Sequence, residues 1–195
     1  MVSSSPNGAP WSTPQALVEQ GQAVSLVNFE DSLYLVYADS DSTGQLHMIH
    51  SDDGSTWSQP QDIPGQFGNL THLSVFNDTM VMLCTNNQSG VLNLSVFDSV
   101  NGWSGVLKGP STSASTVCMG PLGAYFYLAY SEDSPDGTKQ LFVARSSDLT
   151  SNAWDIQQLD GQAGWAYSIV GFGQQLLFYY GGGVTGGYLT IGSVS

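Results

Sequence analysis

Apolar residues recur along this chain in short segments that lack helical spacing. Four segments of five residues are apolar at every position: 33–37, 80–84, 126–130 and 176–180. Gly, Asp, Asn and Pro separate them from the rest of the chain, and no stretch sustains apolar residues at i, i+3, i+4 and i+7. This pattern predicts an all-β fold. Strands that are apolar at every position also predict sheets that are covered on both faces.

The four segments belong to four repeats. Each has a semi-apolar strand before it and a polar, Gly-bearing loop and a third strand after it, and the segments begin 47, 46 and 50 residues apart. The tryptophans give the same period, because Trp11, Trp57, Trp103 and Trp154 are separated by 46, 46 and 51 residues. Repeats of this length predict four-stranded antiparallel meanders, the unit of a β-propeller blade.

We therefore predict one four-bladed β-propeller over residues 1–195, with blades at about 21–65, 66–110, 111–161 and 162–195 plus 2–20. The last repeat stops after three strands. The segment 11–15 repeats the wording of 57–61, so we expect the N-terminal strand to close the ring by pairing with the last blade. The alternative is half of a larger ring made by dimerisation, and a homo-oligomer fits that arrangement.

The charge balance restricts the partners. The chain has a net charge of −13 with three basic residues, so it lacks the clustered Lys and Arg that nucleic acids and anionic membranes require. No apolar run reaches transmembrane length, and residues 1–6 do not resemble a secretory signal peptide. We expect no nucleic-acid binding, no membrane insertion, and a protein that stays in the cytoplasm or leaves without a signal peptide. Cys84 and Cys118 lie in apolar segments and are expected to be buried free thiols.

One repeat carries a recognisable motif. Residues 50–57 read His-Ser-Asp-Asp-Gly-Ser-Thr-Trp, which resembles the Asp-box of sialidase-type propellers, Ser-x-Asp-x-Gly-x-Thr-Trp, with His50 departing at the first position. We expect Asp52 to accept backbone N–H groups across the turn and Gly54 to adopt a positive φ. We expect Trp57 to wedge between sheets. In the resembled family this box lies away from the active site, so Asp52 and the periodic tryptophans are interpreted as structural.

Enzyme chemistry finds little support in the residue counts. The resembled sialidases clamp their substrate with three arginines, and this chain has one, Arg145. Other glycosidases need two opposed carboxylates, for which the narrow axis of a four-bladed ring leaves little room. We find no nucleophile elbow, no zinc cluster and no phosphate-binding loop. The sequence is interpreted as that of a non-enzyme without a cofactor.

A binding site is expected where the first strands begin and where the second and third strands connect. Trp165 is the one tryptophan outside the periodic set, and it either stacks on a sugar or plugs the channel. Amide and acidic residues at equivalent positions suggest repeated sugar contacts. The candidate carbohydrate-binding residues are Trp165, Gln22, Asn69, Asp39, Asn86, Glu132, Tyr37 and Tyr130. The spacing of Asp39 and Asp41 also makes calcium an option.

The repeat plan as a whole resembles small acidic propeller lectins of fungi and bacteria. The resemblance implies glycans or glycoproteins as partners. We therefore predict a carbohydrate-binding lectin without catalytic activity. A protein-interaction propeller with an acidic surface is the alternative, and a glycoside hydrolase comes third.

Overall fold

The computed structural model describes residues 1–5, 8, 10–17, 21–41, 43–68, 70–85, 91–181 and 188–193. Apart from one 3-10 turn, η1 (Leu149–Ser151), the regular structure in these residues consists of β-strands. No helix in this described portion is long and apolar enough to cross a membrane. The predicted all-β class is confirmed.

The strands form four antiparallel sheets, numbered here in chain order. Sheet 1 contains β1 (Gln22–Phe29), β2 (Ser32–Ala38), β3 (Gln45–Ser51) and β4 (Gln61–Phe67). Sheet 2 contains β5 (Leu70–Phe76), β6 (Thr79–Thr85) and β7 (Leu92–Asp98), with the short β8 (Gly102–Trp103) and β9 (Leu107–Lys108) both pairing with β7. Sheet 3 contains β10 (Ala114–Leu122), β11 (Tyr125–Asp133), β12 (Lys139–Ser146) and β13 (Asp155–Ala163). Sheet 4 contains β14 (Trp165–Phe172), β15 (Gln175–Gly181) and β16 (Tyr188–Ser193).

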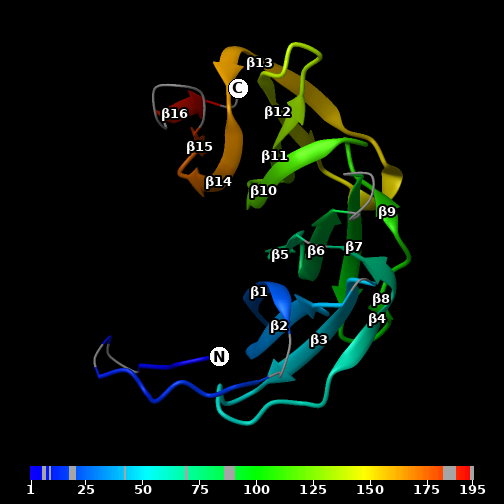
Figure 1. Ribbon diagram of the computed structural model, residues 1–195, viewed down its shortest axis with the longest axis vertical. Helices are drawn as coiled ribbons and strands as arrows, with labels where there is room; N and C mark the ends of the chain where they lie inside the picture. Colours follow the sequence, from blue (N-terminus) through cyan, green and yellow to red (C-terminus); the bar gives the residue numbers. More distant parts are fainter. Residues whose placement is uncertain are drawn as a thin grey trace.

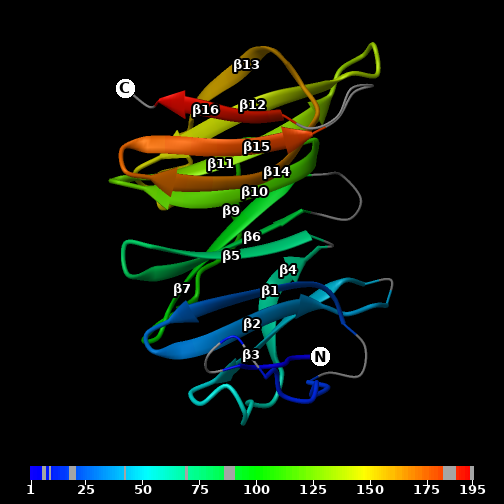
Figure 2. The same cartoon turned by 90° about the vertical axis from the view of Figure 1, so that its left-hand side faces the viewer.

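The four sheets fan around an arc like the blades of a propeller (Figure 1). The first strands β1, β5, β10 and β14 line its concave side, and β4, β8, β9 and β13 lie on its convex side. Turned by 90°, the sheets lie face to face in chain order (Figure 2). The strands of each sheet end on two opposite sides. The loop side carries the connection between the second and third strands. The turn side carries the connections between the first and second strands and between the third and fourth strands.

Three apolar cores hold successive sheets together, and β6 shows how. Met80, Met82 and Cys84 point toward sheet 1 and pack with residues such as Val36 and Ile63. The alternate residues of β6 are Val81 and Leu83, and they join the core shared with sheet 3. A third core joins sheets 3 and 4. The unbroken apolar pattern of 80–84 therefore reflects burial on both faces, as predicted.

Hydrogen bonds between first strands also join neighbouring sheets. The Ser25 hydroxyl accepts the Leu73 backbone N–H at 2.9 Å, which joins sheet 1 to sheet 2. The Thr116 hydroxyl accepts the Ala166 N–H at 2.9 Å, which joins sheet 3 to sheet 4. Each hydroxyl residue directly follows a register shift in its strand, and the shift turns it toward the next sheet.

The N-terminal segment does not close the ring, so that prediction is wrong. Val2 and Gln15 exchange two backbone hydrogen bonds of 2.8 Å, and Ser12 N–H donates to the Ser4 carbonyl oxygen at 2.8 Å, so residues 2–5 and 12–15 form a narrow ribbon paired with itself. Val2 and Leu17 pack on the outward face of sheet 1, whereas Trp11 is 65% exposed. The ribbon and sheet 4 lie at opposite ends of the arc (Figure 1). By pairing with itself, the N-terminal segment forms backbone hydrogen bonds in place of those it was expected to form with the last blade.

The outward face of sheet 4 carries exposed apolar side chains. Phe172 is 72% exposed, and Val170 is also exposed. Tyr167 and Tyr179 stack on each other with ring centroids 5.8 Å apart, and both rings face solvent. The arc therefore ends in an apolar surface.

The other three periodic tryptophans lie against apolar cores. Trp103 packs on the core between sheets 1 and 2, and Trp154 on the core between sheets 2 and 3. Trp57 packs on Leu35, Tyr37 and Ile49 on the outward face of sheet 1. Each tryptophan thus covers the face of its sheet that points back along the chain.

The two cysteines are buried and free, as predicted. Burial raises the pKa of Cys84 and of Cys118 to about 12, because the thiolate loses its hydration in the core. We expect neither thiol to react with Ellman's reagent at pH 8 in the native protein, and both to react in 6 M guanidinium chloride. Prompt labelling of the folded protein would contradict the burial.

Close approach of sheets 3 and 4 requires a glycine at position 171. A Cβ at Gly171 would lie 2.9 Å from Leu122 Cδ1 and 3.1 Å from the Pro121 carbonyl oxygen. We expect Gly171→Ala to lower the free energy of unfolding by about 1–3 kcal/mol, measured by urea denaturation. The control is Gly105→Ala, where the added Cβ meets no atom within 4 Å, and its effect should stay within about 1 kcal/mol. Equal unfolding midpoints for the two variants would refute the packing argument.

Candidate functional site

The motif at 50–57 forms a turn organised by Asp53. Asp53 Oδ1 accepts the backbone N–H groups of Ser55 at 2.7 Å and Thr56 at 2.6 Å. These bonds lower the pKa of Asp53 to about 2. Asp52, the residue expected in this role, instead accepts the Ser32 hydroxyl at 2.8 Å. Gly54 has the expected positive φ of 72°.

Aspartates play the same part in the equivalent turns of sheets 2 and 3. Asp98 accepts the N–H groups of Val100 and Asn101 at 3.0 and 2.6 Å, and Asp148 accepts that of Thr150 at 2.9 Å. Hydrogen bonds lower the pKa of both carboxyl groups. The largest contribution comes from Asn101 for Asp98 and from Thr150 for Asp148. The turns therefore fix the backbone between third and fourth strands.

Three of the predicted site residues meet on sheet 1, around a histidine. Asp39 Oδ2 lies 2.9 Å from His47 Nε2. The Asp39 carbonyl oxygen accepts a hydrogen bond from Gln22 Nε2 at 3.1 Å. Tyr37 is buried and stacks on the imidazole with ring centroids 5.3 Å apart. Burial, followed by the charges of Asp39 and Asp62, raises the pKa of Tyr37.

Sequence reasoning missed His47 and its second carboxylate. Asp62 Oδ1 lies 2.9 Å from His47 Nδ1, so one imidazole contacts a carboxylate at each nitrogen. Neither contact has hydrogen-bond geometry, and both imidazole nitrogens are buried without a hydrogen-bond partner among the described residues. The His47 side chain is 14% exposed, whereas those of Asp39 and Asp62 are 38% and 76% exposed. The two carboxylates thus face solvent beside a mostly buried imidazole ring.

The other predicted residues lie elsewhere. Tyr130 is buried in the core between sheets 2 and 3, stacks on Phe142, and has a pKa raised by burial and then by Glu132. Glu132 accepts the Ser111 hydroxyl. Trp165 begins β14 and is 39% exposed. Asn69 and Asn86 lie outside the described residues.

The calcium candidates have other hydrogen-bonding partners. Asp41 Oδ1 accepts the backbone N–H and the hydroxyl of Thr43 at 2.9 and 2.6 Å, while Asp39 contacts His47. These bonds from Thr43 lower the pKa of Asp41. In the described ranges, no three His, Cys, Asp or Glu residues are grouped as a metal site requires.

The strands that line the concave side of the arc carry no acidic residue. None of the first strands β1, β5, β10 and β14 contains Asp or Glu. Carboxylates that could act on a ligand therefore come from loops and outer strands. The pair around His47 comes from the residue after β2 and from β4.

Comparison with known proteins gives the fold a context. No family model matches the chain, and no curated protein matches its sequence. Solved structures do match. A protein of unknown function from Dyadobacter fermentans has a TM-score of 0.70 at 15% identity, over 96% of this chain and 60% of its own. The GH43B protein of a Bacteroides ovatus xyloglucan PUL has a TM-score of 0.56 at 14% identity, over 88% and 40%.

A third match is the GH32 β-fructofuranosidase BmSUC1 of Bombyx mori, with a TM-score of 0.52 at 14% identity over 84% of this chain and 41% of that one. The chain thus spans about half the length of the structures it matches. At these identities the likeness shows the fold, and it supports the predicted propeller class. The sialidase-type family itself finds no match.

These neighbours contradict two predictions, the lectin without catalytic activity and the absence of an enzyme. Named structures of this fold are glycoside hydrolases. The arginine count excluded one sialidase mechanism and said nothing of carboxylate pairs. The argument from a narrow axis assumed a closed ring of four, whereas the sheets form an open arc.

The Asp53 turn makes stability depend on acid. The pKa of Asp53 in the folded chain, about 2, is below the ordinary value of about 3.9, so its contribution is present above pH 4 and is lost as the pH falls toward 2. We expect Asp53→Asn to lower the melting temperature at pH 6 and to have a smaller effect at pH 2.5. Asp160→Asn, on an exposed strand position, is the control. A pH-independent effect of Asp53→Asn would argue against the linkage.

Proposed function

We propose that this chain acts on a glycan as a glycoside hydrolase, with Asp39 and Asp62 as its carboxylate pair. The observation that carries the proposal is the placement of these two carboxylates at opposite nitrogens of His47, each 2.9 Å away. Glycoside hydrolysis uses two carboxyl groups that flank the scissile bond. The fold of named glycoside hydrolases supports the same class.

The two carboxylates divide the reaction between them. One carboxyl group protonates the oxygen of the leaving sugar, and the other either attacks the anomeric carbon or activates a water. Asp62 and Asp39 are exposed enough for a sugar to reach both. His47 is a positioning residue, because its imidazole ring lies between the two carboxylates and contacts both.

Neighbouring residues hold the imidazole in place. Tyr37 packs flat against the His47 ring and is itself buried with Leu35 and Ile49. Gln22 ties the Asp39 backbone to the start of β1. Rigid support of this kind is what a catalytic pair requires, since misplacement by an ångström is costly.

The remaining sugar contacts are proposed at the loop side. Trp165 exposes its indole at the start of β14, and aromatic rings of this kind stack on sugar faces. By their positions in the sequence, where first strands begin or second strands end, Glu132, Asn69 and Asn86 belong to the same side. Each sheet corresponds to one blade in this proposal, which gives four blades in residues 1–195.

Hydrolysis assays test the proposal directly. Wild-type protein should release chromophore from at least one nitrophenyl glycoside in a panel of galactosides, xylosides, arabinosides and glucosides, or reducing ends from a matching polysaccharide. Asp39→Asn and Asp62→Asn should each lower kcat by about 100-fold or more, since each removes one proton-transfer or nucleophilic group. Their melting temperatures should stay near that of the wild type.

The control is Asp136→Asn. Asp136 is a loop carboxylate of sheet 3 that accepts the backbone N–H and hydroxyl of Thr138, and its loss should leave kcat unchanged. Undiminished turnover in both Asp39→Asn and Asp62→Asn would refute the assignment of the pair. No hydrolysis of any glycoside by folded protein would overturn the function itself.

A further inference from the structure

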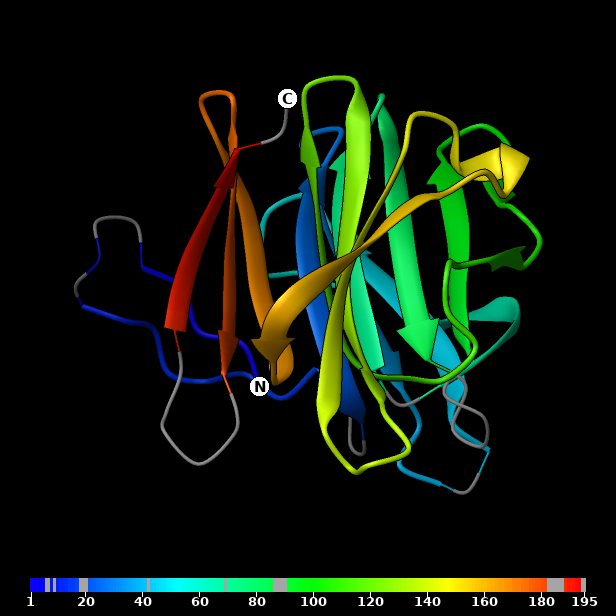
Figure 3. The ribbon, with the colours of Figure 1, turned by 90° about the horizontal axis from the view of Figure 1, so that it is seen from above.

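A pocket of about 400 Å³ lies on the turn side of sheet 3, away from the Asp39–Asp62 pair on sheet 1. It forms between the start of β11 and the connection from β12 to β13. That connection carries η1 on the convex side of the arc (Figure 3). A second hollow of about 450 Å³ adjoins it, and Tyr125 and Arg145 line both.

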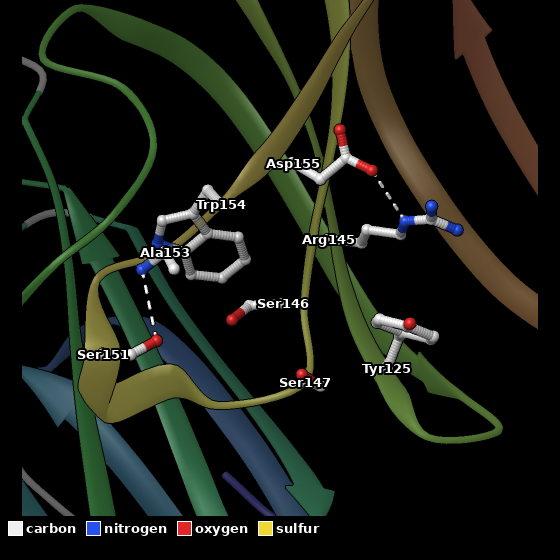
Figure 4. A pocket seen from close by; sticks show the side chains of 8 residues that line it. All are labelled: Tyr125, Arg145, Ser146, Ser147, Ser151, Ala153, Trp154 and Asp155. Atoms are coloured by element: carbon white, nitrogen blue, oxygen red, sulfur yellow. Dashed lines mark hydrogen bonds and ion pairs between the residues drawn. The ribbon is translucent and has the colours of Figure 1, made fainter.

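The pocket has two aromatic walls. Figure 4 shows the rings of Trp154 and Tyr125 on opposite sides, with Ser146 and Ser147 between them. The buried Ser146 hydroxyl bonds to the Asp148 backbone, whereas Ser147 is exposed. Tyr125 is 40% exposed, so its ring is available to a ligand. Trp154 is anchored in the core between sheets 2 and 3, which fixes its position. Rigid aromatic walls with serine residues between them suit a ligand that has both apolar faces and polar edges.

An ion pair borders the same pocket. Arg145 Nε donates to Asp155 Oδ2 at 3.0 Å, and the guanidinium lies 4.9 Å from the centre of the Tyr125 ring. Hydrogen bonds to Tyr127 and Asp155 raise the pKa of Arg145 further. The terminal nitrogens of Arg145 extend away from Asp155 in Figure 4. A donor over the Tyr125 ring therefore stands next to an acceptor, the Asp155 carboxylate.

We propose that this pocket binds one neutral sugar ring of a glycan. Adjacent sugar hydroxyl groups match the paired donor and acceptor of Arg145 and Asp155, and the apolar face of the ring matches Tyr125. The size agrees with a monosaccharide or disaccharide site. Asp155 neutralises Arg145, and the chain has a net charge of −13, so the pocket selects against anionic ligands.

The equivalent place on sheet 1 shows which features are special. There a smaller hollow of about 270 Å³ lies beside Trp57, Asp53 and His50. It has the turn and the tryptophan of the repeat but neither an arginine nor an ion pair, and His50 stacks on Tyr34. The turn and its tryptophan therefore belong to the repeat, whereas Tyr125, Arg145 and Asp155 distinguish sheet 3.

The inference stands on the pocket and does not require hydrolysis at sheet 1. It gives the chain a second contact with a glycan, remote from the bond that is cut. A site of this kind raises the local concentration of a long substrate by multivalent attachment. Small nitrophenyl glycosides would not benefit from it, so binding and turnover can be separated.

Calorimetric titration of the full chain with neutral monosaccharides and oligosaccharides tests the proposal. At least one sugar should bind, and Tyr125→Ala, Arg145→Gln and Asp155→Asn should each weaken its affinity by about tenfold. Arg145→Lys should also weaken binding, because an ammonium group does not reproduce the guanidinium fork. His50→Ala in the sheet 1 hollow is the matched control and should bind like the wild type.

A second measurement, on the wild-type protein, tests the proposal even if the variants fail to fold. In the wild-type protein labelled with ¹⁵N at its indole groups, the sugar should shift the Trp154 signal and leave that of Trp57 in place. Asp39→Asn should lower kcat by about 100-fold or more without changing this shift, which distinguishes failure of the catalytic proposal from failure of this one. Absence of binding to every neutral sugar, unchanged affinity in Tyr125→Ala and Arg145→Gln, or preference for uronic acids or inorganic phosphate would overturn the inference.

Discussion

Burial of the apolar faces of the sheets is the constraint on which this structure depends. Each second strand contains five consecutive apolar residues, so a sheet standing alone would expose one apolar face to water. Sheets 2 and 3 have a neighbouring sheet on each side, as the alternation of Met80 and Val81 between two cores illustrates. Sheet 1 obtains its second cover from the N-terminal ribbon and Trp57, and sheet 4 leaves Phe172 and Val170 exposed.

The two proposed sites use positions that this packing leaves available. Asp39, His47 and Asp62 stand on the outward face of sheet 1, beside residues that hold the ribbon. The Tyr125 pocket uses the turn side of sheet 3, where Trp154 enters the core from the edge. The buried Tyr37 ring packs against His47 at the first site, and the partly buried Trp154 ring forms a wall of the second. Packing thus supplies the rigidity, and the connections supply the chemistry.

Periodic features were predictable from sequence, and single contacts were not. Unbroken apolar runs located the second strands, and tryptophan spacing located the repeats. The repeat wording at Trp11 could not reveal that Val2 would pair with Gln15 instead of sheet 4. Gln22, Tyr37 and Asp39 were predicted together and do meet, but Asp62 reaches His47 through a register shift after Gln45 that no spacing rule indicates. The Tyr125 pocket was not predicted, because Tyr125 and Asp155 are far apart in the chain.

Because the cores join successive sheets, cooperativity in this chain passes mainly between nearest neighbours. Sheet 2 is held from both sides, whereas sheet 4 is held by one core. Amide hydrogens of β14 and β15 should then exchange through local opening, while those of β6 wait for global unfolding. The two sites therefore differ in how firmly the sheets that carry them are held. The Tyr125 pocket borders the protected interior of the array, and the Asp39–Asp62 pair belongs to sheet 1, which shares one core with a neighbouring sheet and has the N-terminal ribbon on its other face.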